Sequence, residues 1–396
     1  MLKKILVIVL CLAMLVGVFA ACSDKAEDNQ EPGATAAPEE NTEPIKIGVA
    51  APITDKWAEY GKGFEVATQM AADKINGAGG INGRMIELVV MDSKGDPKEA
   101  TDIARRFTED EDIIAVVGDF SSTCCMATAP IYTEAKMVQL SPTASHPDYA
   151  GMSEYMFGVM GRQDAEGPFV AKYLANKYLG SEKLAVLYLN NDWGVAAHTN
   201  ILKGAEEIGL EVVALENFVD GEKDFTATLT KIRQTNPDTL CLVMFYNEVS
   251  IISKQIAQMG WDVQVCALGP GTSEQIIELG GEDVEGLATS TPFYVTEEDP
   301  VAWEFKTEFE SKAGFTLNVH SACAYDALTM VAKAIENLGD NVNREDVAAQ
   351  LAGMKDFVGI TGPIVFTADG DVFRKYKIAQ IENGEWIQMT DYDYAD

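Results

Sequence analysis

Hydroxyl side chains gather directly after two apolar runs of the chain. Residues 116–123 read VVGDFSST, and residues 137–145 read MVQLSPTAS. Each segment therefore passes from an apolar run into a cluster of serine and threonine. Such hydroxyls act as nucleophiles when a base activates them, or they hold an anionic group by donating hydrogen bonds. The other residues of the chain decide between these two roles.

The residues that catalysis requires do not occur in a recognisable arrangement. A serine nucleophile needs a base nearby and commonly stands in a G-x-S-x-G turn, which GDFSST does not match. The three histidines, His146, His198 and His320, lie in unrelated segments. No H-E-x-x-H motif, Cys/His cluster or calcium-loop spacing occurs, so we expect no metal site. We therefore expect a protein that is not an enzyme and that needs no cofactor.

Short β-rich runs alternate with helical stretches from Ile45 onward. We predict strands at residues 45–52, 84–92, 113–119 and 137–142, with helices at 61–80, 96–112 and 124–136. After Gly161 the alternation begins again, with strands at 183–190, 211–218, 239–245 and 263–270 and helices at 167–180, 193–209, 224–238 and 248–260. Nearly continuous apolar strands separated by helices predict an α/β fold, with mainly parallel sheets covered by helices on both faces.

The C-terminal part completes these two tandem units. Helical spacing covers residues 300–314 and 321–339, and residues 362–389 are predicted to form a β-hairpin with its turn at Asp369-Gly370. The roughly 350 residues after the leader exceed one ordinary core, so we expect two domains.

Both hydroxyl clusters fall where a ligand would bind in such a fold. Ligands of open α/β sheets lie beyond the carboxyl ends of the strands. Ser122 and Thr123 also precede a predicted helix, whose N-terminus has unpaired N–H groups and suits a carboxylate. The alternative is that Ser122 only caps this helix. The second cluster, at the end of the next strand, favours a ligand site.

The N-terminal residues have the pattern of an export signal. Two lysines precede a long apolar run, so residues 1–21 are predicted to be a signal peptide. The run ends VFAAC and resembles the lipobox of bacterial lipoproteins, in which the cysteine, here Cys22, is lipidated. Phe19 stands where leucine is usual, and an ordinary signal with a coincidental cysteine is the alternative. Residues 22–44 are predicted to be a lipidated cysteine followed by a disordered acidic tether.

Charge and cysteine content exclude further classes of protein. The net charge of −32 at pH 7 argues against a nucleic-acid partner, because lysine and arginine bind phosphate. The cysteines beyond the leader and the anchor are odd in number and show no C-x-x-C spacing, which favours buried free thiols over disulfides. These cysteines are Cys124, Cys125, Cys241, Cys266 and Cys323.

Several longer motifs match a known family in content and order. They are AADKINGAGGINGRMIELVVMDSKGDP, VVGDFSSTCCMATAPIY, LSPTASHP and GEKDFTATLTKIRQTNPD. From about Ile45 to its C-terminus the chain resembles the periplasmic leucine/isoleucine/valine-binding proteins, the solute receptors of branched-chain amino acid ABC importers. The resemblance implies a monomeric receptor, anchored in the membrane by its lipid, that binds a small ligand and docks on ABC permease subunits.

The resemblance also implies a two-lobed, hinged clamp that closes over its ligand. Lobe 1 would comprise residues 45–161 plus 290–374, and lobe 2 would comprise residues 162–289 plus 375–396. The chain would therefore cross between the lobes three times.

The family's contacts to the ligand headgroup transfer to this chain residue by residue. Ser122 would bind the ligand carboxylate through its hydroxyl and backbone N–H. Ser145 stands where the family has threonine, which is an equivalent hydroxyl. Thr143 would offer its backbone carbonyl to the ligand ammonium group.

The contacts to the ligand side chain are aromatic. Tyr60 stands at the family's aromatic position beside the aliphatic pocket. Trp193 and Phe245 stand where the family has two tyrosines, and core packing is the alternative role for both. Further candidates for ligand binding are Trp57, Phe120, Ser121 and Tyr246.

One position departs from the family pattern. Gly271, in LGPGTSEQ, stands where the family has a glutamate that binds the ammonium group. A buried ammonium needs a counter-charge or complete hydrogen bonding. Glu274 or Glu248 could supply it, or the ligand is a carboxylic acid without an ammonium group.

These observations predict one function and leave two alternatives open. We expect an extracytoplasmic receptor for a small carboxylate, with a branched-chain or other aliphatic amino acid as the first choice. The alternatives are a binding protein for an aromatic or short-chain organic acid or amide, and a sensory receptor of the same clamp fold.

Overall fold

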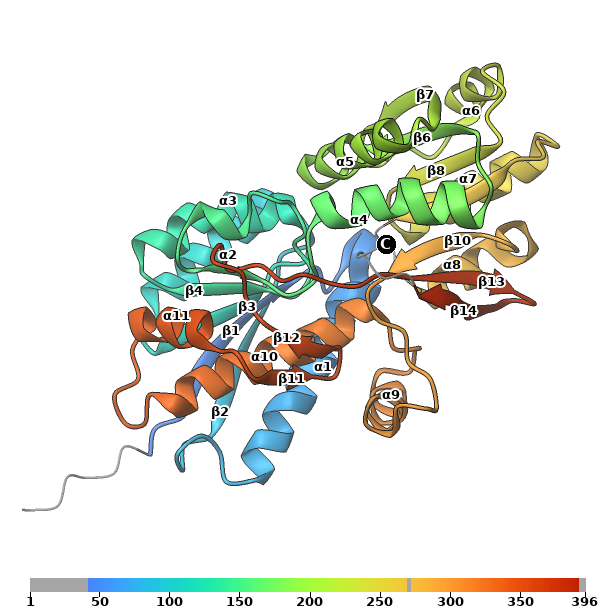
Figure 1. Ribbon diagram of the computed structural model, residues 1–396. Helices are drawn as coiled ribbons and strands as arrows, with labels where there is room; N and C mark the ends of the chain where they lie inside the picture. The colour runs from blue at the N-terminus through green and yellow to red at the C-terminus, as the bar shows by residue number, and fades with distance from the viewer. Residues whose placement is uncertain (1–41, 269–271, 392–396) are drawn as a thin grey trace, which may run out of the picture. The chain divides into compact units, whose positions relative to one another are not determined.

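In the computed structural model, which describes residues 42–268 and 272–391, two large β-sheets are each flanked by helices (Figure 1). The first sheet is parallel and has the strand order β2-β1-β3-β4-β5. Its strands are β1 (Ile45–Ala51), β2 (Ile86–Asp92), β3 (Ile113–Gly118), β4 (Val138–Ser141) and β5 (Met156–Gly158). The central strands β3 and β4 are buried almost throughout, as expected for a parallel sheet that helices cover on both faces.

The second sheet has the strand order β14-β13-β10-β9-β8-β6-β7. Strands β6 to β10 are parallel, whereas β13 and β14 are added as an antiparallel edge. The strands are β6 (Lys183–Leu189), β7 (Glu211–Phe218), β8 (Thr239–Val243), β9 (Gln264–Leu268), β10 (Ala288–Thr291), β13 (Lys377–Glu382) and β14 (Glu385–Asp391).

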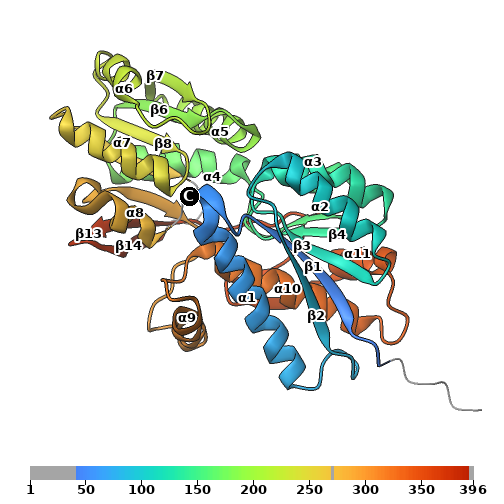
Figure 2. The ribbon, with the colours of Figure 1, turned by 180° about the vertical axis from the view of Figure 1, so that it is seen from behind.

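Helices cover both faces of the first sheet. On one face, α1 (Ala58–Gly77) and α10 (Val319–Asn337) pack against each other and against the strands, with α11 (Arg344–Gly353) beside α10. On the other face lie α2 (Pro97–Glu109) and α3 (Ser122–Glu134), which also contact each other. The helix α9 (Pro300–Ala313) contacts α1. The view from behind in Figure 2 shows α1 in front of this sheet.

The second sheet is covered in the same way. The helix α5 (Asp192–Ile208) packs on β6, β7 and β8, and it also contacts α4 (Gln163–Phe169) and the π-helical segment η3 (Val170–Tyr178). The helices α6 (Thr226–Arg233), α7 (Tyr246–Gln258) and α8 (Glu274–Gly280) lie on the opposite face (Figures 1 and 2). Short 3-10 turns complete the described elements: η1 (Asp55–Trp57), η2 (Ala150–Met152) and η4 (Gly281–Val284).

The two sheets repeat one arrangement of strands. The order β2-β1-β3-β4-β5 of the first sheet corresponds to β7-β6-β8-β9-β10 in the second. The predicted tandem of two similar α/β units is thus confirmed. In this strand order the chain changes direction between β1 and β3, and again between β6 and β8. Such switch points leave a crevice at the carboxyl ends of the strands, where ligands bind.

The predicted single hairpin over residues 362–389 is wrong. The described hairpin pairs β13 with β14, and its turn is Asn383-Gly384, where both residues have positive φ as a two-residue turn of this kind requires. Asp369-Gly370 closes only one isolated bridge, Phe366–Val372. A separate small sheet pairs β11 (Phe357–Gly359) with β12 (Gly362–Ile364).

The hairpin is interrupted because Arg374 holds the intervening segment elsewhere. Its guanidinium donates to the Val159 carbonyl at 2.6 and 2.9 Å and to the Thr361 carbonyl at 3.2 Å. These bonds connect residues near 374 to the end of β5, so the chain leaves the ladder before it enters β13. The sequence prediction used Asp369-Gly370 as the turn and overlooked Asn383-Gly384, which is an equally strong hairpin signal.

The cysteines in the described residues are free and buried, as the sequence predicted. Within residues 42–268 and 272–391 no helix has the length and apolar content needed to cross a membrane. The same residues contain no group of His, Cys, Asp or Glu side chains that could hold a metal ion.

Candidate functional site

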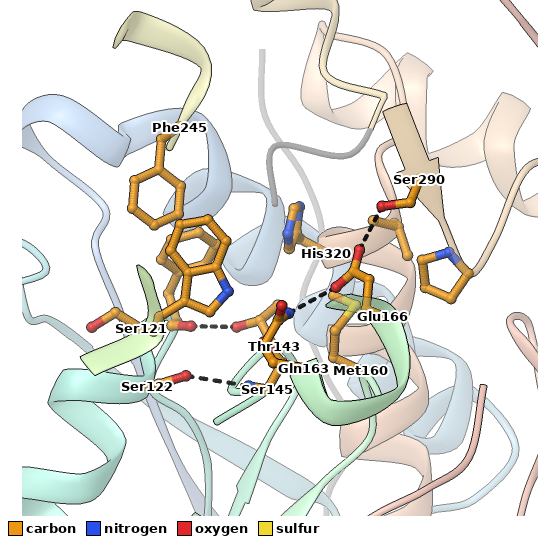
Figure 3. Close-up of a pocket in the computed structure, with 14 residues that line it drawn as sticks. Ser121, Ser122, Thr143, Ser145, Met160, Gln163, Glu166, Phe245, Ser290 and His320 are labelled. Carbon is orange, nitrogen blue, oxygen red and sulfur yellow. Dashed lines mark hydrogen bonds between the residues drawn. The ribbon is translucent and has the colours of Figure 1, made fainter. Parts of the chain in front are cut away.

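A cavity lies beyond the carboxyl ends of strands from both sheets (Figure 3). Its lining residues come mainly from the segments that follow β3, β4, β6, β8 and β10, which is the location predicted for a ligand. The empty space beside them, including the part open to solvent, measures about 540 Å³. The lining residues are Phe120, Ser121, Ser122, Thr143, Ser145, Met160, Gln163, Glu166, Trp193, Phe245, Ser290, Pro292, Val319 and His320.

Ser122 is the first residue of α3 and is buried at the cavity. Its hydroxyl oxygen accepts hydrogen bonds from the backbone N–H groups of Ser145 at 3.2 Å and His146 at 3.3 Å. These bonds occupy the two acceptor sites of a serine hydroxyl and leave its proton free to be donated. Ser122 can therefore donate to an anion in the cavity.

The cap of α3 is Ser121, not Ser122. Ser121 has an extended backbone, and its hydroxyl accepts from the Cys124 N–H at 3.1 Å. The alternative that Ser122 only caps the helix is therefore wrong, because the geometry places the cap one residue earlier. Ser121 and Ser122 together bring the first turn of α3 to the cavity wall. This turn has unpaired N–H groups and a partial positive charge, which favour an anion.

The two residues that follow β4 extend the polar wall. The hydroxyl of Thr143 donates to the Phe120 carbonyl at 2.6 Å and so ties together the segments after β3 and β4. The hydroxyl of Ser145 accepts from Nε2 of Gln163 at 3.0 Å. Ser145 thereby retains its own proton for donation, as Ser122 does.

Aromatic rings form another side of the cavity. Trp193, in the first turn of α5, stacks on Phe245, with ring centroids 5.1 Å apart and an interplanar angle of 26°. The Phe245 ring also lies 5.6 Å from that of Phe120. Trp193 and Phe245 are buried and line the cavity, so they pack the interior and shape the cavity at once.

Tyr60 and Trp57 lie behind this aromatic wall and are not among the lining residues. Tyr60 is fully buried and stacks on Phe120, with centroids 4.6 Å apart and an interplanar angle of 13°. Trp57 contacts Phe245 at a centroid distance of 4.6 Å. In this conformation both rings support the wall from the side away from the lining.

The other sequence candidates lie away from the cavity. Glu248 on α7 is buried but is not a lining residue, and Glu274, the first residue of α8, lines a different pocket. Tyr246 is also outside the lining, and its hydroxyl donates to the Lys56 carbonyl at 2.9 Å. Gly271 lies outside the described residues. Neither Glu248 nor Glu274 therefore lines the cavity in the described structure.

Sequence reasoning missed half of the lining. The missed residues are Met160, Gln163, Glu166, Ser290, Pro292, Val319 and His320. They lie where the chain leaves β5 for α4, at the end of β10 and at the start of α10. A signal existed for α4, because GRQDAEG carries a glutamine and a glutamate three residues apart, and this spacing places both on one face of a helix.

Glu166 is the acidic residue of the lining. Its Oε1 accepts from the Ser290 hydroxyl at 2.8 Å, and its Oε2 accepts from Nε2 of Gln163 at 2.7 Å. Burial raises the pKa of Glu166 to about 7, although both hydrogen bonds lower it. Figure 3 shows these two bonds beside Met160 and His320.

Comparison with known proteins identifies the family of this chain. A family model described as periplasmic binding protein matches residues 44–385. The chain belongs to the periplasmic binding protein family. The leucine-, isoleucine-, valine-, threonine-, and alanine-binding protein of Pseudomonas aeruginosa is 30% identical over 332 residues, which are 83% of this chain and 87% of that protein.

Solved structures of this family share the fold. The leucine-binding protein LivK of Thermotoga maritima superimposes with a TM-score of 0.83 at 27% identity, over 89% of this chain and 99% of that chain. LivJ of Streptococcus pneumoniae, a branched-chain amino acid transporter substrate-binding protein solved with isoleucine, gives 0.80 at 27% identity, over 87% and 100% of the two chains.

These comparisons confirm the predicted resemblance and the two-lobed α/β fold class. The chain is a substrate-binding protein and not an enzyme. Its family acts outside the cytoplasm as the binding component of ABC importers, and the relatives named above bind branched-chain amino acids.

Proposed function

We propose that this periplasmic binding protein captures a branched-chain or other aliphatic amino acid in the cavity and delivers it to the permease subunits of an ABC importer. The observation that carries this proposal is one cavity with hydroxyl donors at the start of α3 and an aromatic wall beside them. An aliphatic amino acid offers a carboxylate to the donors and an apolar side chain to the rings. The isoleucine in the Streptococcus protein supports this choice.

The hydroxyl groups have distinct roles in this proposal. Ser122 and Ser145 each have a free proton and donate it to the ligand carboxylate, while the helix N-terminus adds its partial charge. Thr143 is fixed by its bond to Phe120 and presents its carbonyl to the ligand ammonium. Gly271 adjoins the bound ligand in the family pattern.

The aromatic residues surround the ligand side chain. Trp193 and Phe245 form the wall that this side chain contacts. Phe120, which lies beside Phe245, also lines the cavity and extends this wall. Tyr60 and Trp57 act through Phe120 and Phe245 in the described conformation.

Hinged closure fits the contacts between elements of the two sheets. The Lys56 carbonyl, in the turn before α1, accepts from the Tyr246 hydroxyl at 2.9 Å and from Asn247 Nδ2 at 2.7 Å, both in α7. These bonds would form only when the clamp is shut. We keep lobe 1 as residues 45–161 plus 290–374 and lobe 2 as 162–289 plus 375–396. Ser290 and Thr291 pair within the second sheet, however, which favours a crossing just after Thr291, two residues later than this boundary.

We also propose that the receptor acts as a monomer held at the membrane by a lipid. Residues 1–21 would be removed, Cys22 would be lipidated, and the acidic segment to residue 44 would tether the folded part. These residues, except the last three, lie outside the described part of the chain.

The binding free energy expected from these contacts suits a receptor that must later release its ligand. Burial of one aliphatic side chain contributes roughly 1.5–3 kcal/mol. Each hydrogen bond to a charged group adds roughly 1.5–3 kcal/mol. After the costs of closure and ordering, three or four such bonds approach the roughly 8 kcal/mol of a micromolar Kd.

Thermal unfolding with added ligands tests the proposal. The full chain, purified in detergent, is melted with each of the twenty common amino acids, and the hits are titrated by calorimetry. We expect leucine, isoleucine and valine to raise the unfolding temperature most, because a ligand that binds only the folded state stabilises it. If no amino acid raises it, the proposed ligand class is wrong.

The aromatic wall favours one second candidate, an aromatic carboxylic acid. A planar ring could stack on Trp193 or Phe245 while its carboxylate meets Ser122. Benzoate therefore belongs in the same experiment. A rise in unfolding temperature with benzoate, and none with the aliphatic amino acids, would select this second function.

A further inference from the structure

A chain of hydrogen bonds connects the hydroxyl cluster to a buried carboxylate. The Ser122 hydroxyl accepts from the backbone N–H of Ser145, and the Ser145 hydroxyl accepts from Nε2 of Gln163 at 3.0 Å. The same nitrogen of Gln163 donates to Glu166 at 2.7 Å. The carboxylate of Glu166 in turn accepts from the Ser290 hydroxyl at 2.8 Å (Figure 3).

This chain leaves one buried acceptor without a partner. Both hydrogens of the Gln163 amide nitrogen are used, by Ser145 and Glu166. The other atom of the amide, Oε1, is buried and accepts no hydrogen bond from any described residue. Gln163 is 1% exposed and lines the cavity. An unpaired buried amide oxygen costs free energy that a donor from a ligand would recover.

Glu166 is a buried acid without a counter-charge. None of the lining residues in the described part of the chain is a lysine or an arginine, and His320 is the one side chain among them that could become cationic. A carboxylate has about four acceptor sites, and the hydrogen bonds from Gln163 and Ser290 occupy two of them. Buried charges are normally paired, so this site lacks a cation.

We propose that Glu166 and the Oε1 atom of Gln163 together receive the ammonium group of the bound ligand, in place of the glutamate that Gly271 replaces. The inference rests on the proposed function and narrows it. The cavity offers donors at Ser122 and Ser145 and acceptors at Gln163 and Glu166, which matches the two charges of an amino acid. A carboxylic acid without an amine would leave the acceptors of Gln163 and Glu166 unpaired. We therefore expect the cavity to bind such an acid much more weakly than an amino acid.

The assignment has a consequence for protons. Burial raises the pKa of Glu166 to about 7, so the acid is substantially protonated in the empty site at neutral pH. A bound ammonium favours the carboxylate form. Binding of an amino acid therefore releases a proton, and the affinity falls as the pH decreases below 7. A plain acid would show the opposite trend, because its own negative charge prefers a neutral Glu166.

Other groups near Glu166 could also contribute to the pH dependence of binding, and among them only His320 is a concern. The helix α4 itself carries Asp164, which pairs with Arg162 and is partly exposed. From β8 comes the Cys241 thiol, whose pKa is raised, and β10 contributes the uncharged Ser290. From α10 comes His320, which also lines the cavity and could titrate. A variant of Glu166 is therefore needed to assign the pH dependence.

Leucine and 4-methylpentanoate provide the deciding pair of ligands, because they differ only in the ammonium group. Calorimetric titration of the full chain is expected to give much tighter binding of leucine. Glu166→Gln keeps the shape and removes the charge: its one oxygen can still accept from Gln163, and its NH2 group would then donate to the Ser290 hydroxyl. We expect this change to weaken leucine binding roughly 10- to 150-fold. It should not weaken binding of 4-methylpentanoate. Asp164→Asn, an acid on the same helix that faces away from the cavity lining, is the matched control and should bind leucine normally.

The pH series is the second readout. In the original protein the affinity for leucine is expected to fall roughly 30-fold from pH 8 to pH 5.5, as one proton with a pKa near 7 predicts. In Glu166→Gln this dependence should largely disappear. Thermal melts of both variants without ligand establish that they are folded.

The outcomes separate this inference from the proposed function. Leucine binding that is unchanged in Glu166→Gln, or matched by 4-methylpentanoate, overturns the ammonium site and leaves an amino-acid receptor in place. Binding of benzoate or 4-methylpentanoate without binding of any amino acid overturns the proposed ligand class and the ammonium site together. Weakening of leucine alone, with loss of the pH dependence, supports both.

Discussion

The Ser273 hydroxyl lies 3.0 Å from each carboxylate oxygen of Glu59 and so joins α8 to α1, helices that flank different sheets. Asn318, the cap of α10, donates to the same carboxylate at 3.0 Å. Because α10 packs on α1, opening of the clamp would separate Glu59 from Ser273 but not from Asn318. In the hinged clamp that we propose, the bond between Glu59 and Ser273 would therefore exist in the closed form alone.

At pH 8, where most of Glu59 is ionised, we expect Ser273→Ala to weaken ligand binding about tenfold, because one hydrogen bond to a charged group stabilises the closed form by roughly 1.5 kcal/mol. The effect should lie in the dissociation rate, measured by stopped-flow fluorescence. Ser273 also caps α8 by accepting from the Gln275 N–H. Ser273→Asp retains a cap and repels Glu59, so it should weaken binding at least as much. Normal affinity in Ser273→Asp would exclude this bond from closure.

The adjacent serines at the start of α3 should respond differently to substitution. We expect Ser122→Ala to weaken leucine binding by roughly 1.5–3 kcal/mol with little change in the free energy of unfolding. Ser121→Ala should instead cost about 1 kcal/mol of stability, because it removes the cap of α3. Calorimetry and urea unfolding of both variants measure the two effects. Equal losses of stability in the two variants would contradict this division of roles.

The fold was predictable because its signals are local. The strand β3 is an unbroken apolar run, and the helices beside it have apolar residues at helical spacing with clear ends. The hydroxyl clusters could be placed from the same pattern, since the carboxyl ends of parallel strands meet at one edge. Ser122, Thr143 and Ser145 do line the cavity.

The missing half of the cavity depends on long-range packing. Ser290 and Glu166 are 124 positions apart in the chain, and only the folded arrangement reveals that they share a hydrogen bond. Tyr60 could be recognised as an aromatic near the site, but its place behind Phe120 depends on ring stacking. No period or spacing in the sequence encodes such contacts.

The lipid anchor is tested independently of the fold. We expect Cys22→Ala to release the protein from the membrane fraction into the soluble extracytoplasmic fraction, because a single residue would carry the lipid. Fractionation followed by immunoblotting measures the distribution. Cys323→Ala serves as a control, since this cysteine is buried in α10 and cannot carry a lipid. Membrane retention of Cys22→Ala would contradict the anchor.

Buried carboxyl groups should also make the empty protein less stable as the pH rises. Burial raises the pKa of Glu59, Glu166 and Asp371 to about 7 and that of Asp119 to about 6. The same groups ionise near pH 4 in the unfolded chain. Their stabilising effect is complete below pH 4 and is lost as the pH rises towards 7, because the unfolded state releases its protons first.

Between pH 5.5 and pH 8 the free energy of unfolding should therefore fall by roughly 2 kcal/mol for each group with a pKa near 7. Urea unfolding at both pH values measures it. Burial lowers the pKa of His198, so this residue makes the free energy of unfolding rise with pH. Its effect falls mainly below pH 6.5. Glu166→Gln removes one titrating group and should reduce this fall in the free energy of unfolding by the share of that group. A stability that stays constant or rises over this range would show that these carboxyl groups ionise normally in the folded protein.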